Sequence, residues 1–200
     1  MAKLGLISDV HGDSLALELA WSHLIVQGVD AILCAGDVVG YGPYPDRVVK
    51  FLNDKRIPVI RGNHDRWALE RGPGQPDEFG GGTPSRETLE YLSGLQGDHV
   101  FELGGRVGVM VHGSPRSDME YVSRSVFPPS RLDGVLEELK ADVLVVGHTH
   151  EPMWYRSSRG LVVNPGSVLS VKTRARTSRT FAVVNLSDLS ATIHDVESGR

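Results

Sequence analysis

Five short segments of the sequence combine aspartate, asparagine and histidine with glycine, and five of the eight histidines fall within them. Carboxylate, amide and imidazole groups without any thiolate suit a borderline divalent ion such as Mn²⁺, Fe²⁺ or Zn²⁺ better than Mg²⁺, which prefers oxygen ligands. Seven such donors are too many for one ion that keeps a position open for chemistry, whereas two ions about 3.5–4 Å apart that share a carboxylate can use them all. The segments are Asp9-Val10-His11, Gly36-Asp37, Gly62-Asn63-His64-Asp65, His112-Gly113 and Gly147-His148-Thr149-His150.

Each segment directly follows a short apolar run that we expect to be a buried strand. In an α/β sheet the carboxyl ends of the strands meet at one edge, so residues far apart in sequence can converge there. The neighbouring glycines permit unusual dihedral angles and let the backbone approach an ion closely. The sequence therefore predicts one composite site at the strand ends. The expected strands cover residues 3–8, 30–35, 57–61, 106–111 and 142–147.

The segments between the first strands have helical periodicity. A helix over Ser14–Gln27 has Asp13 or Ser14 available as its N-cap and Gly28 as its C-terminal stop, and a second helix covers Asp46–Asp54. Short buried strands that alternate with such helices are typical of parallel βαβ units. Further helices are expected at about 65–71, 84–94 and 129–140.

The second half of the chain contains closely spaced apolar runs joined by turn sequences such as Gly104-Gly105. This spacing favours antiparallel pairing, so we expect a more mixed sheet there. Apolar runs are spread evenly, which predicts one domain over residues 1–200, of the α/β class with two packed sheets and helices outside. The expected strands of this half are 100–103, 106–111, 142–147, 153–157, 160–163, 180–186 and 190–195.

The composition excludes several classes of protein. A formal net charge of −4 argues against a broad basic surface, so we do not expect nucleic acid as a partner. The apolar run after Met1 is interrupted at Asp9, which is too soon for a signal peptide or a membrane span, and we expect a soluble cytoplasmic protein with no membrane partner. The single cysteine, Cys34, lies in an apolar run and is expected to be a core residue.

The order of the five segments resembles that of the calcineurin-like metallophosphoesterases, in particular their small single-domain bacterial and archaeal phosphodiesterases. The match covers nearly the whole chain, and three further stretches support it. The resemblance implies a four-layer αββα sandwich with two mixed β-sheets. The additional stretches are Gly36–Pro43, His112–Arg116 and Asn164–Ser167.

The resemblance also implies how two metal ions are held, with Asp37 as the bridge. Manganese is the expected metal, with iron, zinc or nickel as alternatives. His64 would face the substrate and donate a proton to the leaving oxygen or stabilise charge on the phosphoryl group, and Asp65 would orient its imidazole. One metal would be bound by Asp9, His11, Asp37 and His150, and the other by Asp37, Asn63, His112 and His148.

One departure from the wider family concerns the phosphate contacts. Protein Ser/Thr phosphatases of the superfamily carry an Asp-Arg pair where this chain has Gly40-Tyr41, which argues against a phosphoprotein substrate. Tyr41, Arg61 and Arg116 are candidates for substrate contacts in place of that arginine. The basic run Lys172–Arg179 could supply further phosphate contacts or could be a solvated loop.

The resemblance implies an enzyme that hydrolyses a phosphodiester or another small phosphoester by means of a hydroxide bridging two metals. Alternatives are a phosphomonoesterase, a protein phosphatase, a dinucleoside polyphosphate hydrolase and a nuclease. A scaffold role, known for the retromer subunit similar to this family, is disfavoured because all seven ligand positions and His64 are present. The substrate, the native metal and the oligomeric state stay open. We expect the choice of substrate to depend on residues 41–44, 66–82 and 114–127.

Overall fold

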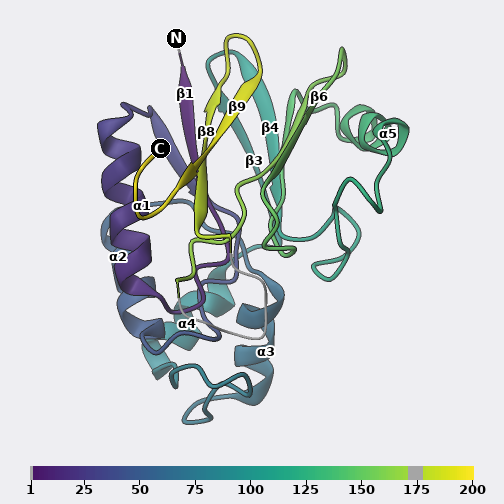
Figure 1. Ribbon diagram of the computed structural model, residues 1–200. Coiled ribbons are helices and arrows are strands. Elements are labelled where there is room, and N and C mark those ends of the chain that lie inside the picture. Colours follow the sequence, from purple (N-terminus) through teal and green to yellow (C-terminus); the bar gives the residue numbers. More distant parts are fainter. Residues whose placement is uncertain (1, 171–177) are drawn as a thin grey trace.

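The computed structural model describes residues 2–170 and 178–200, and within these ranges the chain forms nine strands and five helices (Figure 1). The strands are β1 (Lys3–Ile7), β2 (Ala31–Cys34), β3 (Asp98–Leu103), β4 (Arg106–Val111), β5 (Val143–Val145), β6 (Met153–Arg156), β7 (Leu161–Asn164), β8 (Thr180–Asn185) and β9 (Ser190–Asp195). The helices are α1 (Ser14–Val26), α2 (Pro45–Asp54), α3 (Asn63–Arg71), α4 (Arg86–Gly94) and α5 (Pro129–Leu139).

The strands form two mixed sheets. In the first sheet the order is β2-β1-β8-β9, with β1 parallel to β2 and antiparallel to β8. In the second sheet the order is β3-β4-β5-β7-β6, in which the three central strands are parallel and both edge strands are antiparallel to their neighbours. The prediction of a more mixed second half is confirmed, and the first sheet is also mixed because β8 returns to pair with β1.

Three apolar clusters separate four layers of structure. One cluster lies between the first sheet and the helices α1, α2 and α4, and includes Leu17, Val48 and Phe181. A second fills the space between the two sheets, and a third packs α5 against the outer face of the second sheet. Figure 1 shows α1 and α2 on one side of the paired sheets and α5 on the other. The predicted α/β sandwich with helices outside two mixed sheets is thus confirmed.

Helix α1 begins as its sequence predicts. The Asp13 side chain accepts a hydrogen bond from the backbone N–H of Ala16 at 3.1 Å, which satisfies one of the donors left free at the start of the helix. Gly28 follows the helix with φ +67°, a conformation that glycine adopts without strain. The helix therefore returns the chain from the end of β1 to the start of the parallel strand β2.

The predicted strand 57–61 is wrong. This segment makes only an isolated parallel bridge between Val59 and Cys34, with hydrogen bonds from Cys34 N to Pro58 O and from Ile60 N to Cys34 O. Pro58 has no N–H and cannot extend a ladder, so the segment lies beside β2 without becoming a full strand. It still directs the chain to the same end of the sheet, where α3 begins at Asn63.

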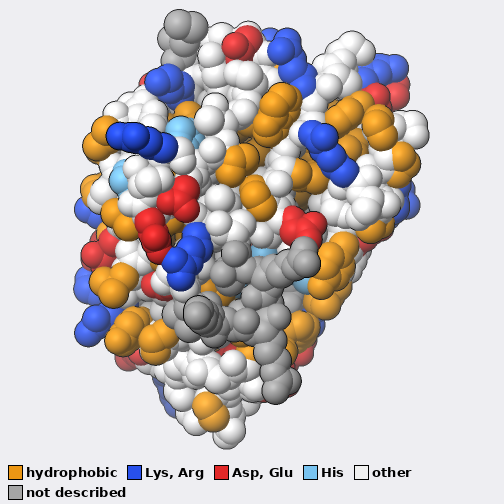
Figure 2. Space-filling model, viewed as in Figure 1, with side chains coloured by type: hydrophobic (Ala, Val, Ile, Leu, Met, Phe, Trp, Pro, Cys, Tyr) orange, Lys and Arg blue, Asp and Glu red, His pale blue; other side chains and the backbone are white. Residues whose placement is uncertain are grey.

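The longest described helix has 13 residues, and charges of both signs share the face drawn in Figure 2. Among the described helices, none is both long enough and apolar enough to cross a membrane. On the face drawn in Figure 2, Lys and Arg side chains are scattered among Asp and Glu and do not gather into one broad basic patch.

Candidate metal centre

The predicted metal ligands lie in turns at the ends of four strands and at the first residue of α3. Although they span most of the chain, they all reach one end of the paired sheets, where α3 and α4 also lie (Figure 1). The convergence expected for strand ends in α/β proteins is therefore observed. Asp9 and His11 follow β1, Asp37 follows β2, His112 follows β4, His148 and His150 follow β5, and Asn63 opens α3.

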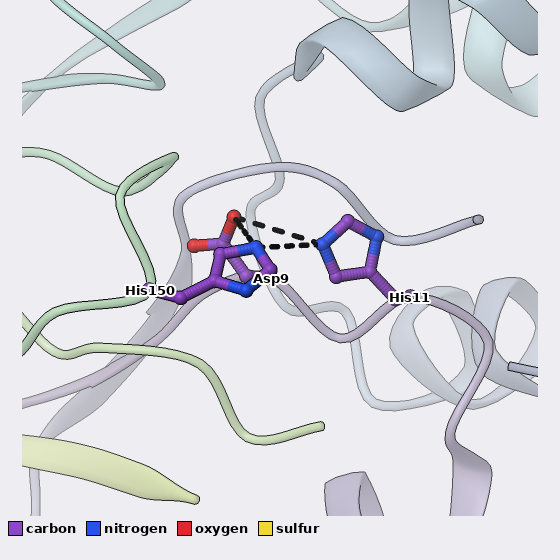
Figure 3. Close-up of side chains that lie close together, drawn as sticks. All are labelled: Asp9, His11 and His150. Carbon is purple, nitrogen blue, oxygen red and sulfur yellow. Dashed lines mark hydrogen bonds and ion pairs between the residues drawn. The ribbon is translucent and has the colours of Figure 1, made fainter. Parts of the chain in front are cut away.

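Asp9, His11 and His150 form a first buried group whose ligand atoms all lie within 4.8 Å of one another (Figure 3). The Nε2 atoms of His11 and His150 are 3.0 Å apart. Asp9 Oδ1 lies 3.2 Å from His150 Nε2 and 3.9 Å from His11 Nε2. Two imidazole nitrogens and a carboxylate oxygen thus point at one small volume, which is the arrangement that a divalent ion requires.

Asp37, His112 and His148 form a second group with the same limit of 4.8 Å. His112 Nε2 lies 3.2 Å from Asp37 Oδ2 and 3.0 Å from Asn63 Oδ1, so the amide of Asn63 joins this group. Asp37 Oδ2 is also 3.8 Å from His11 Nε2 of the first group. The carboxylate of Asp37 therefore stands between the two groups, in the position of the predicted bridge.

Backbone carbonyl groups fix the orientation of two imidazoles. His11 Nδ1 lies 3.1 Å from Val39 O, and His112 Nδ1 lies 2.7 Å from Ala35 O. When Nδ1–H donates to a carbonyl oxygen, Nε2 is left to face the carboxylates with its lone pair, as is usual for histidines that bind metals. The chain therefore selects the ring nitrogen that is offered to the centre.

Burial and charge act in opposite directions on the groups of the centre. Burial lowers the pKa of His11 to about 3, so this ring is neutral. Burial also disfavours the charged form of His112, but the charges of Asp37 and Asp9 outweigh it and raise the pKa of His112 to about 10. Burial likewise raises the pKa of Asp37, but the nearby histidines, His112 foremost, lower it overall. In the protein without metal, Asp37 and His112 therefore form a buried ion pair.

The ligand turns have an unusual backbone. Asp9, His11, Asp37, His148 and His150 all have φ between +49° and +65°, which is the left-handed region. Residues other than glycine occupy this region at a cost of about 1 kcal/mol or more, and such conformations concentrate at functional sites. The fold thus holds five of the seven predicted ligands in conformations that local preference opposes.

These residues fit a pair of divalent metal ions. The donors are carboxylate, amide and imidazole groups in two buried sets joined by Asp37. His148 belongs to the second set, and its Nε2 is buried without a hydrogen-bond partner among the described residues. Burial lowers the pKa of His148, which leaves a neutral nitrogen suited to a metal.

His64 lies at the centre and also in the cavity above it. Its ligand atoms fall within 4.8 Å of those of His11 and Asp37, and its backbone N–H donates to Asp37 Oδ1 at 2.8 Å. Burial lowers its pKa, and its Nδ1 has no hydrogen-bond partner among the described residues. Its ring faces Tyr41 at a centroid distance of 4.8 Å. His64 can therefore reach a substrate in the cavity.

Asp65 does not orient the imidazole of His64, contrary to the prediction. Its two carboxylate oxygens accept four backbone N–H groups at 2.9–3.1 Å, from Asp37, Val38, Val39 and Gly62. Burial and the charge of Asp37 raise the pKa of Asp65 to about 7 against the effect of these donors. Asp65 therefore positions the turn that carries Asp37.

The three predicted substrate contacts lie in different places. Tyr41 lines a cavity of about 230 Å³ that is also bordered by His64 and by four of the candidate ligands, Asp37, Asn63, His148 and His150. Arg61 and Arg116 instead line a separate cavity of about 490 Å³, which borders His112 but none of the other candidate ligands, so the structure does not bring them to that first cavity. Arg61 and Arg116 were chosen because each stands next to a ligand motif in the sequence. That position does not determine the direction in which the side chain points.

The basic run Lys172–Arg179 lies largely outside the described residues, since only its last two residues are described. Arg179 is bound to Glu197 and donates from Nη2 to Ser170 O at 2.8 Å. Its guanidinium group is therefore occupied by contacts within the protein. The prediction that this run contacts phosphate is without support from the part of it that the structure describes.

Several residues that support the centre were not singled out from the sequence. Ser8 Oγ donates to Asp9 Oδ2 at 2.5 Å, and Ser167 Oγ donates to Asp9 O at 2.8 Å. Asn164 Nδ2 donates to Gly147 O at 2.8 Å and so holds the turn before His148. The stretch Asn164–Ser167 was part of the resemblance, and its role is to fasten the turns after β1 and β5.

Comparison with known proteins defines the class of this protein. The model of the calcineurin-like phosphoesterase superfamily domain matches residues 2–189. A probable metallophosphoesterase of Methanothermobacter thermautotrophicus is 29% identical over 167 residues, which cover 82% of this chain and 76% of the relative. The chain therefore belongs to the calcineurin-like phosphoesterase superfamily and is a metal-dependent phosphoesterase.

Solved structures agree with this assignment. The crystal structure of a metallophosphoesterase from Sphaerobacter thermophilus is 26% identical, with a TM-score of 0.71 over 96% of this chain and 87% of the other. A structure described as a novel archaeal phosphodiesterase is 19% identical, with a TM-score of 0.60 over 96% of this chain and 98% of the other. The second likeness concerns the fold alone.

Proposed function

We propose that this protein hydrolyses a phosphodiester with the help of two divalent metal ions, most favourably Mn²⁺. The observation that carries the proposal is the pair of buried donor sets joined by the carboxylate of Asp37. Mixed nitrogen and oxygen donors favour Mn²⁺, Fe²⁺ or Zn²⁺ over Mg²⁺. The proposed ligands of one ion are Asp9, His11, Asp37 and His150, and those of the other are Asp37, Asn63, His112 and His148.

Two ions held by these residues would supply Lewis acidity for the phosphoryl oxygens and a lowered pKa for water. Asp37 would hold the two ions together, while the carbonyl groups of Ala35 and Val39 keep His112 and His11 turned toward them. His64 would face the leaving group. Because burial lowers its pKa, its ring is neutral near pH 7 and carries one N–H that can donate a hydrogen bond to the leaving oxygen and stabilise the charge that develops there.

The charge of the cavity supports a diester over a monoester. No Lys or Arg is found among the described residues that line the cavity above the centre. A phosphomonoester carries about 1.5 to 2 negative charges near pH 7, whereas a diester carries one. Because none of the described lining residues is cationic, this part of the wall offers less than a basic wall would to hold a monoester dianion. This difference favours the diester, and it also argues against a phosphoprotein substrate.

We also propose a cytoplasmic location. Cys34 is buried and unpaired, as expected in a reducing compartment where disulfides are rare. Burial raises the pKa of its thiol, which makes the thiol unreactive. The cysteine is therefore part of the core and has no role in the proposed reaction.

The test is a comparison of chelator-stripped and Mn²⁺-reloaded protein on a chromogenic phosphodiester and the matching monoester. We expect hydrolysis only with metal, and a higher kcat/KM for the diester. His64→Ala should lower kcat about 10²-fold or more, as expected when one hydrogen-bond donor to a developing negative charge is lost, while His99→Ala on the distant strand β3 should leave it unchanged. Equal rates with and without metal would refute the metal mechanism, and an unchanged kcat for His64→Ala would remove that residue from the reaction.

A further inference from the structure

The cavity above the metal centre has walls that are mainly aromatic. Three segments of the chain form these walls. All three lie within residues 41–44, 66–82 and 114–127, on which we expected the choice of substrate to depend. Four aromatic rings and one methionine surround the ligand side chains and Thr149 at the floor. The wall residues are Tyr41, Trp67, Phe79, Met119 and Tyr121.

Three of the rings form a continuous surface beside His64. The ring of His64 lies 4.8 Å from that of Trp67 and 5.0 Å from that of Phe79. Phe79 in turn lies 5.3 Å from Tyr41 and 5.9 Å from Trp67, measured between ring centroids. These are the separations at which aromatic rings attract one another. The surface therefore leads directly from the proposed leaving-group side into the cavity.

Three of the five wall residues are large side chains that are partly open to solvent. Phe79 is 46% exposed, Met119 is 40% exposed and Tyr121 is 55% exposed. Tyr121 also faces His148 at 4.7 Å, so the second metal group has an aromatic neighbour as well. Apolar side chains gathered in the open around a functional site mark a surface that a ligand covers.

The loop that carries Phe79 is held in place by its own contacts. Buried Asp77 binds Arg71 Nη2 at 2.8 Å and accepts the backbone N–H of Phe79 at 2.9 Å. Gly82 N donates to Gly42 O at 2.9 Å, which joins this loop to the turn of Tyr41. Phe79 is thus presented by a fixed loop, and the wall exists before any ligand arrives, which reduces the entropy cost of binding.

We infer that the substrate is a phosphoester that carries a flat aromatic group, which lies against the surface formed by Tyr41, Trp67 and Phe79 while its phosphate reaches the metal centre. This inference rests on the proposed function and specifies its substrate class. Aromatic side chains stack on flat rings irrespective of the polar groups at the ring edge. The aromatic group is a nucleobase or an aryl ring, and these two sources share the chemistry that the wall recognises.

The test compares pairs of ligands that share a phosphorus group and differ in the ring. The first pair is phenylphosphonate and methylphosphonate, which have no ester bond to hydrolyse and differ by the phenyl ring. The second pair is AMP and ribose 5-phosphate, which differ by the nucleobase. Isothermal titration of the Mn²⁺-loaded protein should show about tenfold tighter binding of the aromatic member, as expected for one stacked ring. A preference in the AMP pair identifies a nucleotide, and a preference confined to the phenyl pair identifies an aryl ester. Equal Kd values in both pairs would overturn the inference.

Variants locate the effect on the wall. Phe79→Leu and Trp67→Leu should remove most of the tenfold preference while Kd for methylphosphonate stays unchanged. Phe79→Leu alters a partly exposed loop residue and is expected to fold even if Trp67→Leu does not. The matched control is Trp154→Leu on β6, which lines a different cavity and should keep the preference. A preference that survives in Phe79→Leu and in folded Trp67→Leu would also overturn the inference.

The same experiments separate this inference from the proposed function. A protein that cleaves phosphodiesters with Mn²⁺ but binds both members of each pair equally would refute the aromatic substrate alone. A protein that prefers phenylphosphonate through Trp67 and Phe79 but cleaves no phosphoester would refute the proposed function alone. Binding and hydrolysis are measured independently, so each outcome bears on one conclusion.

Discussion

Gly62 offers a sharp test of how the bridge is built. A Cβ atom placed on Gly62 would lie 2.1 Å from Asp37 Oδ1 and 2.5 Å from Asp37 N. The backbone of Gly62 is extended, with φ −93° and ψ −177°, so alanine fits its dihedral angles. Any penalty for Gly62→Ala must therefore come from the collision with Asp37. We predict that this single methyl group displaces the bridging carboxylate.

The size of the effect of Gly62→Ala can be estimated from the distance between the added methyl group and Asp37. Ordinary contact begins near 3.4 Å, so the methyl group is about 1.3 Å too close to Asp37 Oδ1. Metal sites tolerate errors of about 0.2 Å in ligand distances, and misplacement of a reacting group by about 1 Å costs roughly 10²-fold in rate. Forcing an extra methyl group into a packed site costs about 1–3 kcal/mol of stability. For a chain of this size, that loss lowers Tm by about 2–12 °C.

The assay measures three quantities for Gly62→Ala: Tm without metal, Kd for Mn²⁺ by calorimetry, and kcat/KM for a phosphodiester with saturating Mn²⁺. We expect Tm and kcat/KM to fall and Kd for Mn²⁺ to rise. The control is Gly134→Ala in α5, the same chemical change where nothing lies within 4 Å of the added methyl group. Alanine in a helix interior should raise stability by about 0.5–1 kcal/mol, with activity unchanged.

Unchanged metal binding and activity in Gly62→Ala would refute the predicted displacement of Asp37. If Gly62→Ala bound Mn²⁺ and turned over substrate as the original protein does, the turn would have moved without moving the carboxylate of Asp37. The close packing of Gly62 against the bridge would then have no functional meaning. A fall in Tm alone would show a packing defect and would equally contradict the predicted displacement of the bridge.

Two further predictions concern metal binding. The pKa of His112 is raised from 6.5 to about 10, so its protonated form stabilises the metal-free fold fully below pH 6.5 and this contribution is lost as the pH rises through about 10. Mn²⁺ needs the neutral ring, so calorimetry near pH 8 in buffers of different ionisation enthalpy should detect about one proton released per protein, and no release would contradict the ion pair. Free Mn²⁺ at 100 times its Kd should stabilise the fold by about 2.7 kcal/mol and raise Tm by about 5–10 °C. An equal rise in Asp37→Asn would show that the metal binds elsewhere.

The convergence of the candidate ligands could be predicted from the sequence because it follows a general rule. Each motif follows an apolar run, and strand ends in α/β sheets converge, so Asp37 and His150 could be placed together without knowledge of any contact. The residue types also indicated the donor chemistry. Conversely, the segment 57–61 looked like a strand because it is apolar, and the missing N–H of Pro58 limited it to one bridge.

The role of Asp65 could not be read from its place beside His64. Because α3 begins at Asn63, the two residues are consecutive on a helix, and consecutive side chains point about 100° apart. Asp65 therefore turns toward the amides of residues 37–39 while His64 turns toward the cavity. A strand or loop at this place would have given different neighbours.

The aromatic wall was beyond prediction for another reason. Trp67, Phe79 and Tyr121 come from one helix and two irregular segments, and irregular segments have no periodicity that fixes where a side chain points. The glycines of residues 72–82 indicated turns only. The contacts of Asp77 and Gly82 decide the position of Phe79, and both depend on packing against distant parts of the chain.

The position of β1 in its sheet affects how the protein folds. β1 pairs with β2 early in the sequence, but its other neighbour is β8, with Leu4 opposite Val184. Two hydrogen bonds to the end of β1 and the turn after it come from much later residues: Ser167 Oγ donates to Asp9 O, and the backbone N–H of Val168 donates to Ser8 O. The turn that carries Asp9 and His11 therefore bonds both to residues 36–42 and to residues more than 150 positions later. Contacts between residues so distant in sequence slow folding, so we expect this turn to reach its final arrangement only after the C-terminal part of the chain has been made.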